Sequence, residues 1–108
     1  MRIIHNLSKD ARAKIIEILL ENRSKKELAE ELEISPAAVT KFVNGITHPS
    51  DDTIEKAIEI ADDEEKREIL NIIIDDIMIS VEELVNEYKL VDKKVEKIKK
   101  ILNTITYP

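Results

Sequence analysis

Few side chains in this 108-residue sequence are arranged to do covalent chemistry. The two histidines, His5 and His48, are isolated, and there is no cysteine, no His-Glu-x-x-His motif and no glycine-rich phosphate loop. The carboxylate pairs Asp51-Asp52, Asp62-Asp63 and Asp75-Asp76 are neighbours in sequence, so their side chains diverge on a helix. We therefore expect no catalytic site, no metal site and no cofactor.

Two segments are instead suited to binding an anion. Ser24 and Glu27 have the spacing of a capping box, which starts a helix. Ser35 is a good N-cap, and Pro36 fits the first position of a second helix. The first turn of a helix presents free backbone N–H groups, which bind phosphate. Because the Lys25-Lys26 pair adds positive charge, both helix starts are candidate phosphate contacts.

Apolar residues on these two helices are placed to pack them at a sharp angle. They occupy the inward positions of a two-helix unit, and they are Leu28, Ala29, Leu32, Ile34, Val39 and Phe42. The connection is Glu33-Ile34, and Asn44-Gly45 ends the second helix because glycine accepts a left-handed cap. This arrangement predicts a helix-turn-helix, whose second helix fits the major groove of DNA.

Residues 24–61 resemble the phage-repressor (Cro-like, XRE-like) helix-turn-helix family. The six apolar residues stand at that family's core positions, and its NG-x-x-x-P ending is present from Asn44 to Pro49. One position departs from the family. Glu33 stands in the turn where glycine is usual, and a non-glycine residue is strained there if its φ is positive. The resemblance implies an all-α domain that binds DNA.

The resemblance also implies which residues face DNA. Ala37 and the methyl group of Thr40 suit thymine methyl groups, and Lys41 suits guanine O6 and N7. For His48 a solvated loop position is the alternative. The predicted DNA-binding residues are Lys25, Lys26, Ser35, Pro36, Ala37, Thr40, Lys41, Asn44, Thr47 and His48.

Further helices are expected on both sides of this unit. A helix from Ser8 to about residue 22 turns an apolar stripe inward and leaves Lys9, Arg12 and Lys14 free for solvent or phosphate. Ser50 caps a helix over 51–61, and another begins near residue 64. With no alternating strand pattern, the fold class is all-α. We expect a five-helix repressor-like domain over 1–78 and a C-terminal helical extension over 79–108.

The extension carries a heptad pattern, in which apolar residues recur at alternating spacings of four and three. This seam comprises Leu70, Ile74, Ile77, Val81, Leu84, Tyr88, Val91, Val95, Ile98, Leu102 and Ile105. The segment is either one long helix or a hairpin of two shorter helices, for which Ser80 and Asp92 are the candidate N-caps. We expect the seam to form a homodimer, and the alternative is that the tail packs onto its own domain.

Charge is distributed unevenly along the chain. The net charge is −6, with +1 over residues 1–48 and −7 over residues 49–108. A DNA-binding protein can be acidic overall if its acidic face points away from phosphate. The alternative is a charged surface typical of proteins from organisms living at high temperature. Since there is no 18-residue apolar run and no signal peptide, we expect a soluble, cytoplasmic protein without a membrane partner.

These features together predict sequence-specific binding of double-stranded DNA by a homodimer, at an inverted-repeat site, with a role in transcription regulation. No small-molecule effector is expected. One alternative is a helical protein-interaction adaptor, and another is a structural DNA-binding protein without strong sequence preference. Thr40 and Lys41 favour DNA, because a protein-binding groove would carry leucine or aromatic residues at these positions.

Overall fold

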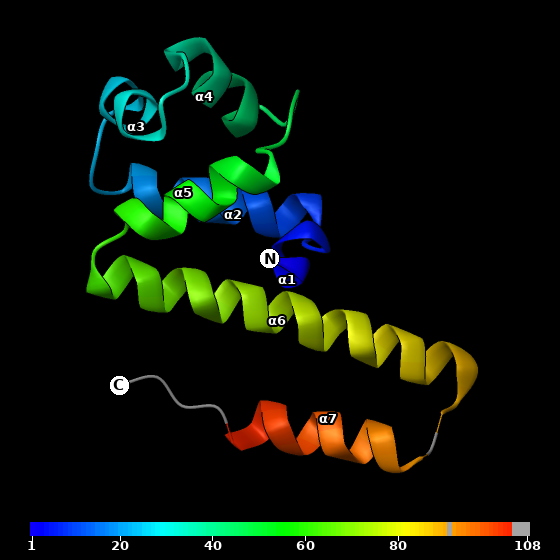
Figure 1. Ribbon diagram of the computed structural model, residues 1–108. Coiled ribbons are helices and arrows are strands. Elements are labelled where there is room, and N and C mark those ends of the chain that lie inside the picture. The colour runs from blue at the N-terminus through cyan, green and yellow to red at the C-terminus, as the bar shows by residue number, and fades with distance from the viewer. Residues whose placement is uncertain (91, 105–108) are drawn as a thin grey trace.

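Capping residues begin most of the helices in the computed structural model, which describes residues 1–90 and 92–104. The described residues form seven helices and no strand (Figure 1). Their bounds are α1 Arg2–His5, α2 Lys9–Leu20, α3 Lys25–Leu32, α4 Pro36–Val43, α5 Asp51–Ile60, α6 Asp63–Tyr88 and α7 Lys93–Thr104. The all-α prediction is confirmed. The five predicted helices correspond to α2–α6, and α1 is a short addition before them.

Each helix from α2 to α6 starts at a side chain that accepts a bond from the backbone N–H three residues on. These N-caps are Ser8, Ser24, Ser35, Ser50 and Asp62. Asp62 is part of a reciprocal capping box, because the Glu65 carboxylate accepts in return from the Asp62 N–H. The predicted starts at the four serines are confirmed, and α6 begins one residue before the predicted position.

One hydrophobic core joins helices α1 to α6. Ile15, Leu28, Val39, Ile54 and Ile69 are among its fully buried members. Each comes from a different helix, α2 to α6 in turn, so the core holds the whole helix-turn-helix domain together. Long α6 crosses beneath α2 and α5, while α3 and α4 lie at the opposite end of the molecule (Figure 1).

Arg12 is not free for solvent or phosphate, and that prediction was wrong. Its side chain is buried, and the guanidinium donates to the carbonyl oxygens of Ile4 at 2.7 Å and Pro49 at 2.9 Å. It also pairs with the Asp51 carboxylate at 2.7 Å. Backbone carbonyls at the end of α1 and before α5 lack helical partners, and a buried guanidinium supplies donors for several of them at once. Arg12 therefore fixes α1 and the start of α5 to α2.

The C-terminal segment is a helical hairpin, in which α7 runs back along α6 (Figure 1). Ser80 does not start a helix, since its hydroxyl donates to the Asp76 carbonyl inside α6. Lys89 ends α6 in the left-handed conformation, at φ 52°. Asp92 starts α7, because its carboxylate accepts from the Val95 N–H at 3.0 Å. The predicted boundary between residues 78 and 79 falls inside α6. Val91 and Ile105 of the seam lie outside the described residues.

A buried ion pair connects the end of α2 to the start of α6. The Arg23 guanidinium donates to both oxygens of the Glu65 carboxylate, at 2.7 Å and 3.1 Å. Asn22 donates to the same carboxylate at 3.2 Å. The bonds from Arg23, reinforced by the N–H of Asp62, lower the pKa of Glu65 from 4.5 to about 2 against the opposing effect of burial. Glu65 thus stabilises the fold in its ionised form.

This pair predicts a specific loss of stability in acid. Because the folded-state pKa of Glu65 is depressed, its contribution is present above about pH 4.5 and is lost as the pH falls towards 2. The contribution at neutral pH is at most about 3 kcal/mol. We expect Glu65→Gln to lower the unfolding free energy at pH 7 and to flatten its decline between pH 5 and pH 2, as measured by urea denaturation.

Glu31→Gln is the matched control. Glu31 also pairs with Arg23, at 2.7 Å, but its side chain is largely exposed, so little change is expected. If the unfolding free energy of Glu65→Gln fell as steeply as that of the wild-type protein between pH 5 and pH 2, other carboxylates would be responsible for the acid sensitivity.

Among the residues that the structure describes, two that are not glycine have positive φ, Glu33 at 59° and Lys89 at 52°. Glu33 lies in the turn where the resembling family has glycine, and its carboxylate pairs with Lys56 of α5. We expect Lys89→Gly to stabilise the protein by about 0.5–1 kcal/mol, because glycine carries no left-handed penalty. Glu33→Gly should stabilise it less, since the ion pair is lost.

Combining variants separates the relief of the left-handed conformation from the loss of the Glu33–Lys56 ion pair, as measured by thermal unfolding. In a Lys56→Met background, Glu33→Gly should raise the melting temperature as much as Lys89→Gly does. A fall in melting temperature in that background would show that the Glu33 side chain has a structural role beyond the pair with Lys56.

Candidate nucleic-acid interface

The turn between α3 and α4 sets the exposed side of α4. Glu33 closes α3 in the left-handed conformation, and the Ile34 N–H donates back to the Ala29 carbonyl at 2.9 Å. Ser35 then caps α4, with Pro36 at its first position. The helix turns Val39 and Phe42 into the core, so its opposite side faces solvent. This is the helix-turn-helix geometry that the sequence predicted.

The exposed side of α4 carries small and polar residues. Ala37, Lys41 and Asn44 are exposed there, whereas Thr40 is half-buried at the edge. Ser35 and Pro36 are exposed at the start of the helix. The structure therefore brings these six predicted residues together at one end of the molecule (Figure 1). A surface of this kind has room for the close approach of a base edge.

Helix starts give this surface its backbone donors. At α4, Pro36 has no N–H, and the Ser35 hydroxyl oxygen accepts a hydrogen bond from the Ala38 N–H at 3.1 Å. Within the described residues this leaves the N–H of Ala37 for an outside acceptor. At α3, Lys25 and Lys26 are exposed in the first turn. These features suit phosphate oxygens at both helix starts.

One carboxylate offsets part of this charge. Hydrogen bonds from the Ser24 backbone and side chain lower the pKa of Glu27, which keeps it ionised in the first turn of α3. Glu27 completes the predicted capping box. The positive charge of this helix start is therefore carried by Lys25 and Lys26 rather than by the turn as a whole.

The loop after α4 has a fixed backbone. Gly45 has φ 70°, its N–H donates to the Phe42 carbonyl, and the Ile46 N–H donates to the Lys41 carbonyl at 2.9 Å. These two bonds define a Schellman motif. The remaining predicted contacts, Thr47 and His48, are exposed along this loop. Sequence reasoning missed Ile46, whose apolar side chain is also exposed.

Seam residues of the predicted dimer interface differ in how far their own chain covers them. Val95 is buried against α6, whereas Leu84, Tyr88 and Ile98 are exposed. The remaining described positions are half-buried, and they are Leu70, Ile74, Ile77, Val81 and Leu102. The hairpin therefore satisfies part of the heptad pattern within one chain and leaves part of it uncovered.

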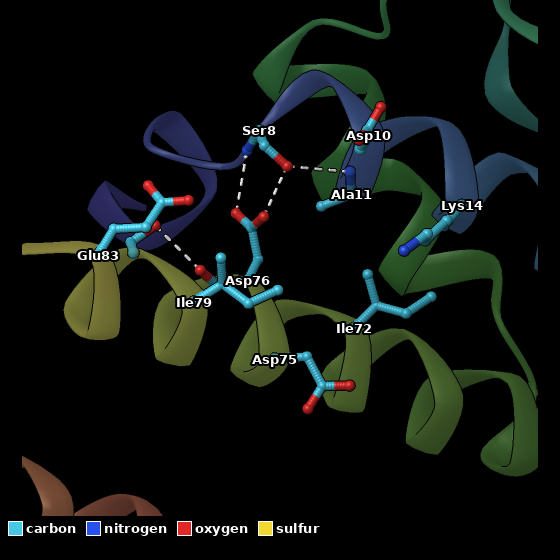
Figure 2. Close-up of a pocket in the computed structure, with 10 residues that line it drawn as sticks. Ser8, Asp10, Ala11, Lys14, Ile72, Asp75, Asp76, Ile79 and Glu83 are labelled. Atoms are coloured by element: carbon cyan, nitrogen blue, oxygen red, sulfur yellow. Dashed lines mark hydrogen bonds between the residues drawn. The ribbon is translucent and has the colours of Figure 1, made fainter. Parts of the chain in front are cut away.

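A separate hollow of about 300 Å³ lies between the start of α2 and the middle of α6 (Figure 2). Asp76 occupies its wall, where it accepts from the backbone N–H of Ser8 at 3.0 Å and from the Ser8 hydroxyl at 2.6 Å. Asp10, Lys14 and Glu83 also line it. The bonds to Ser8 give Asp76 a structural role, because they anchor the capped end of α2 on α6.

Two structural features of the described part of the chain bear on other functions. No group of three or more histidine, cysteine, aspartate or glutamate side chains is placed to hold a metal ion there. In the same residues, no helix combines the length and apolar character needed to cross a membrane.

Comparison with known protein families agrees with the geometry. Residues 15–61 match the helix-turn-helix family. The matched segment begins within α2 and ends just after α5, so it includes all of α3 and α4. This segment is therefore similar to the helix-turn-helix family, and the resemblance that the sequence pattern indicated is confirmed over these residues. Neither the curated proteins nor the solved structures gave a match.

Two lysine substitutions should affect DNA binding in different ways. Lys41→Ala should cost about 1–3 kcal/mol on the preferred site and relax the preference at one base pair, because Lys41 is placed to reach a base edge. Lys25→Ala should weaken all duplexes similarly and reduce the salt slope by about one, as expected for a phosphate contact. Fluorescence anisotropy over a range of salt concentrations measures both effects.

Lys97→Ala provides the matched control, because Lys97 is exposed on α7 and remote from α4. It should leave both the base preference and the salt slope unchanged. If Lys41→Ala and Lys97→Ala gave the same result, α4 would not be the base-reading helix.

Proposed function

We propose that the protein is a transcription regulator that binds a specific double-stranded DNA site as a homodimer. The observation that carries the proposal is the exposed side of α4, where Ala37, Lys41 and Asn44 stand free of the core. These residues offer an apolar contact, a cation and an amide, three of the groups that distinguish base edges in the major groove. The lysines of α3 and the N–H of Ala37 are placed for the adjacent phosphates.

The case for a homodimer rests on the uncovered part of the hairpin. Leu84 is 52% exposed, and Tyr88 and Ile98 are exposed with it. Ile101 of α7 adds a further exposed apolar side chain. Moving a fully exposed side chain of this size out of water contributes about 1.5–3 kcal/mol, and these partly covered side chains would contribute the share that is still exposed. A second copy of the hairpin presents the same apolar residues, and a two-fold pair would bury both sets against each other.

A dimer also supplies the specificity that one domain lacks. One recognition helix contacts only a few base pairs, which is too few to define a unique site in a genome. Two-fold symmetry would present the two α4 helices in opposite directions, to major grooves about 34 Å apart. The preferred site should therefore be an inverted repeat.

Among the alternative functions, the helical adaptor is disfavoured by the composition of the α4 surface. An adaptor groove requires several large apolar anchors at helical spacing, whereas the exposed residues of α4 are mostly small or polar and Val43 is the large apolar residue among them. A structural DNA-binding role without sequence preference differs from our proposal in one measurable respect. It predicts equal affinity for unrelated duplexes, whereas selection from random DNA should recover one site here.

Charge placed on the uncovered seam tests the dimer. We expect Leu84→Glu with Tyr88→Glu to give folded monomers in sedimentation equilibrium, because both side chains lie outside the monomer's core. Affinity for the selected site should fall by more than about 100-fold, since each half-site is then bound alone. Circular dichroism should remain that of the wild-type protein.

The control is Ile79→Glu with Asn86→Glu, two exposed positions of α6 outside the seam that change the charge equally. It should leave both the dimer and the affinity intact. A Leu84→Glu, Tyr88→Glu protein that stayed dimeric with full affinity would remove the seam from the dimer interface.

A further inference from the structure

Ile46 is an exposed apolar residue beside the DNA-facing helix, in a part of the chain where such residues are rare. Between residues 4 and 78, the exposed large apolar side chains are Val43, at 42%, and Ile46, at 67%. The other exposed large apolar residues of the described chain lie at its N-terminus or in the hairpin. Val43 is the last residue of α4, and Ile46 follows three residues later. The exposed apolar side chain of Ile46 is therefore explained neither by packing in the core nor by a place in the seam.

The backbone holds Ile46 in place from both sides. On one side, its N–H donates to the Lys41 carbonyl at 2.9 Å, and Gly45 before it donates to Phe42 at 3.2 Å. On the other side, the Pro49 carbonyl accepts from the buried Arg12 guanidinium at 2.9 Å. Ile46 is therefore presented on a fixed loop, and a contact made by its side chain would lose little backbone entropy.

The fold itself does not use this side chain. In a Schellman motif, the residue at the position of Ile46 commonly makes an apolar contact with the last turn of the helix. Here the facing residue is Lys41, and Ile46 remains two-thirds exposed. The motif is thus closed by its backbone bonds, and the isoleucine side chain is left for an outside partner.

The position of Ile46 identifies that partner. Its backbone is bonded to Lys41, and it lies between the predicted DNA contacts Asn44 and Thr47. We propose that Ile46 contacts the C5-methyl group of a thymine in the major groove and so selects thymine at one position of each half-site. This inference rests on the proposed function, and it adds a specificity-determining residue to it. The thymine methyl is the apolar group that a base pair presents in that groove.

A second copy of the chain fits this position less well. A stable protein interface buries about 800 Å² per partner, which two isolated apolar side chains among polar neighbours do not supply. A thymine methyl needs only one apolar side chain to cover it. Ile46 is moreover bonded through its backbone to Lys41 of α4, and α4 lies far from α7 of the hairpin (Figure 1).

The test replaces each thymine of the selected site by uracil, which removes only the methyl group. For the wild-type protein, a single replacement in one half-site should weaken binding about four-fold, the factor expected for one methyl-sized group left uncovered. For Ile46→Ser, thymine and uracil at that position should bind equally. Ile46→Val should retain most of the discrimination, and Ile79→Ser, at a side chain 54% exposed on α6, should match the wild-type protein throughout.

Three results would overturn the inference. One is a uracil scan without any sensitive position on a site that the wild-type protein binds specifically, which would leave the proposed function intact. Another is a sensitive position that responds to uracil equally in the wild-type protein and in Ile46→Ser. The third is a change in sedimentation for Ile46→Ser, which would assign the residue to a second copy. Absence of any preferred site for the wild-type protein would instead overturn the proposed function together with this inference.

Discussion

The packing of α6 across α2 supports both halves of this molecule. Ile69 and Ile73 of α6 are buried in the same core as Ile15 and Leu19 of α2. Burying side chains of this size contributes about 1.5–3 kcal/mol each, which makes the apolar contact the main source of attachment. Polar bonds at its two ends then fix the register. Arg23 and Asn22 bind Glu65 at the start of α6, and Ser8 binds Asp76, which lies about one helical turn beyond Ile73.

In the function that we propose, this arrangement would link DNA binding to dimer assembly through one rigid helix. The 26 residues of α6 span about 39 Å at ~1.5 Å per residue. Its first half closes the core of the helix-turn-helix domain, and its second half carries α7 and the uncovered seam. Because no turn interrupts the helix, the position of a second copy on the seam would set the position of its α4. The distance between the two reading helices would then be a property of α6 rather than of a flexible linker.

Sequence reasoning predicted the elements whose signals are local. The serine N-caps, the Ser24–Glu27 capping box and the apolar positions of α3 and α4 each depend on a few neighbouring residues, and the sequence predicted them, whereas it did not predict the Asp62–Glu65 capping box. The choice between one long helix and a hairpin was not local. Ser80 and Asp92 are both good N-caps, but Ser80 lies in a continuous helix, whereas Lys89 takes a left-handed conformation that its residue type does not signal.

The residues that the sequence misplaced or missed depend on distant parts of the chain. Arg12 has the pattern of a surface residue, and only the fold places the carbonyls of Ile4 and Pro49 around it. Ile46 carries no helical periodicity, because it lies in a loop. Its exposure follows from the Schellman geometry, which places Ile46 opposite Lys41 rather than opposite an apolar residue. That geometry is known only from the folded loop.

Hydroxyl-radical footprinting on a site selected from random DNA tests the central claim most directly, because it reports where both reading helices lie on one duplex. The account predicts two protected clusters, related by two-fold symmetry and centred one helical turn, about 34 Å, apart on the same face. A single protected cluster on an asymmetric site, or uniform weak protection without a preferred sequence, would contradict it.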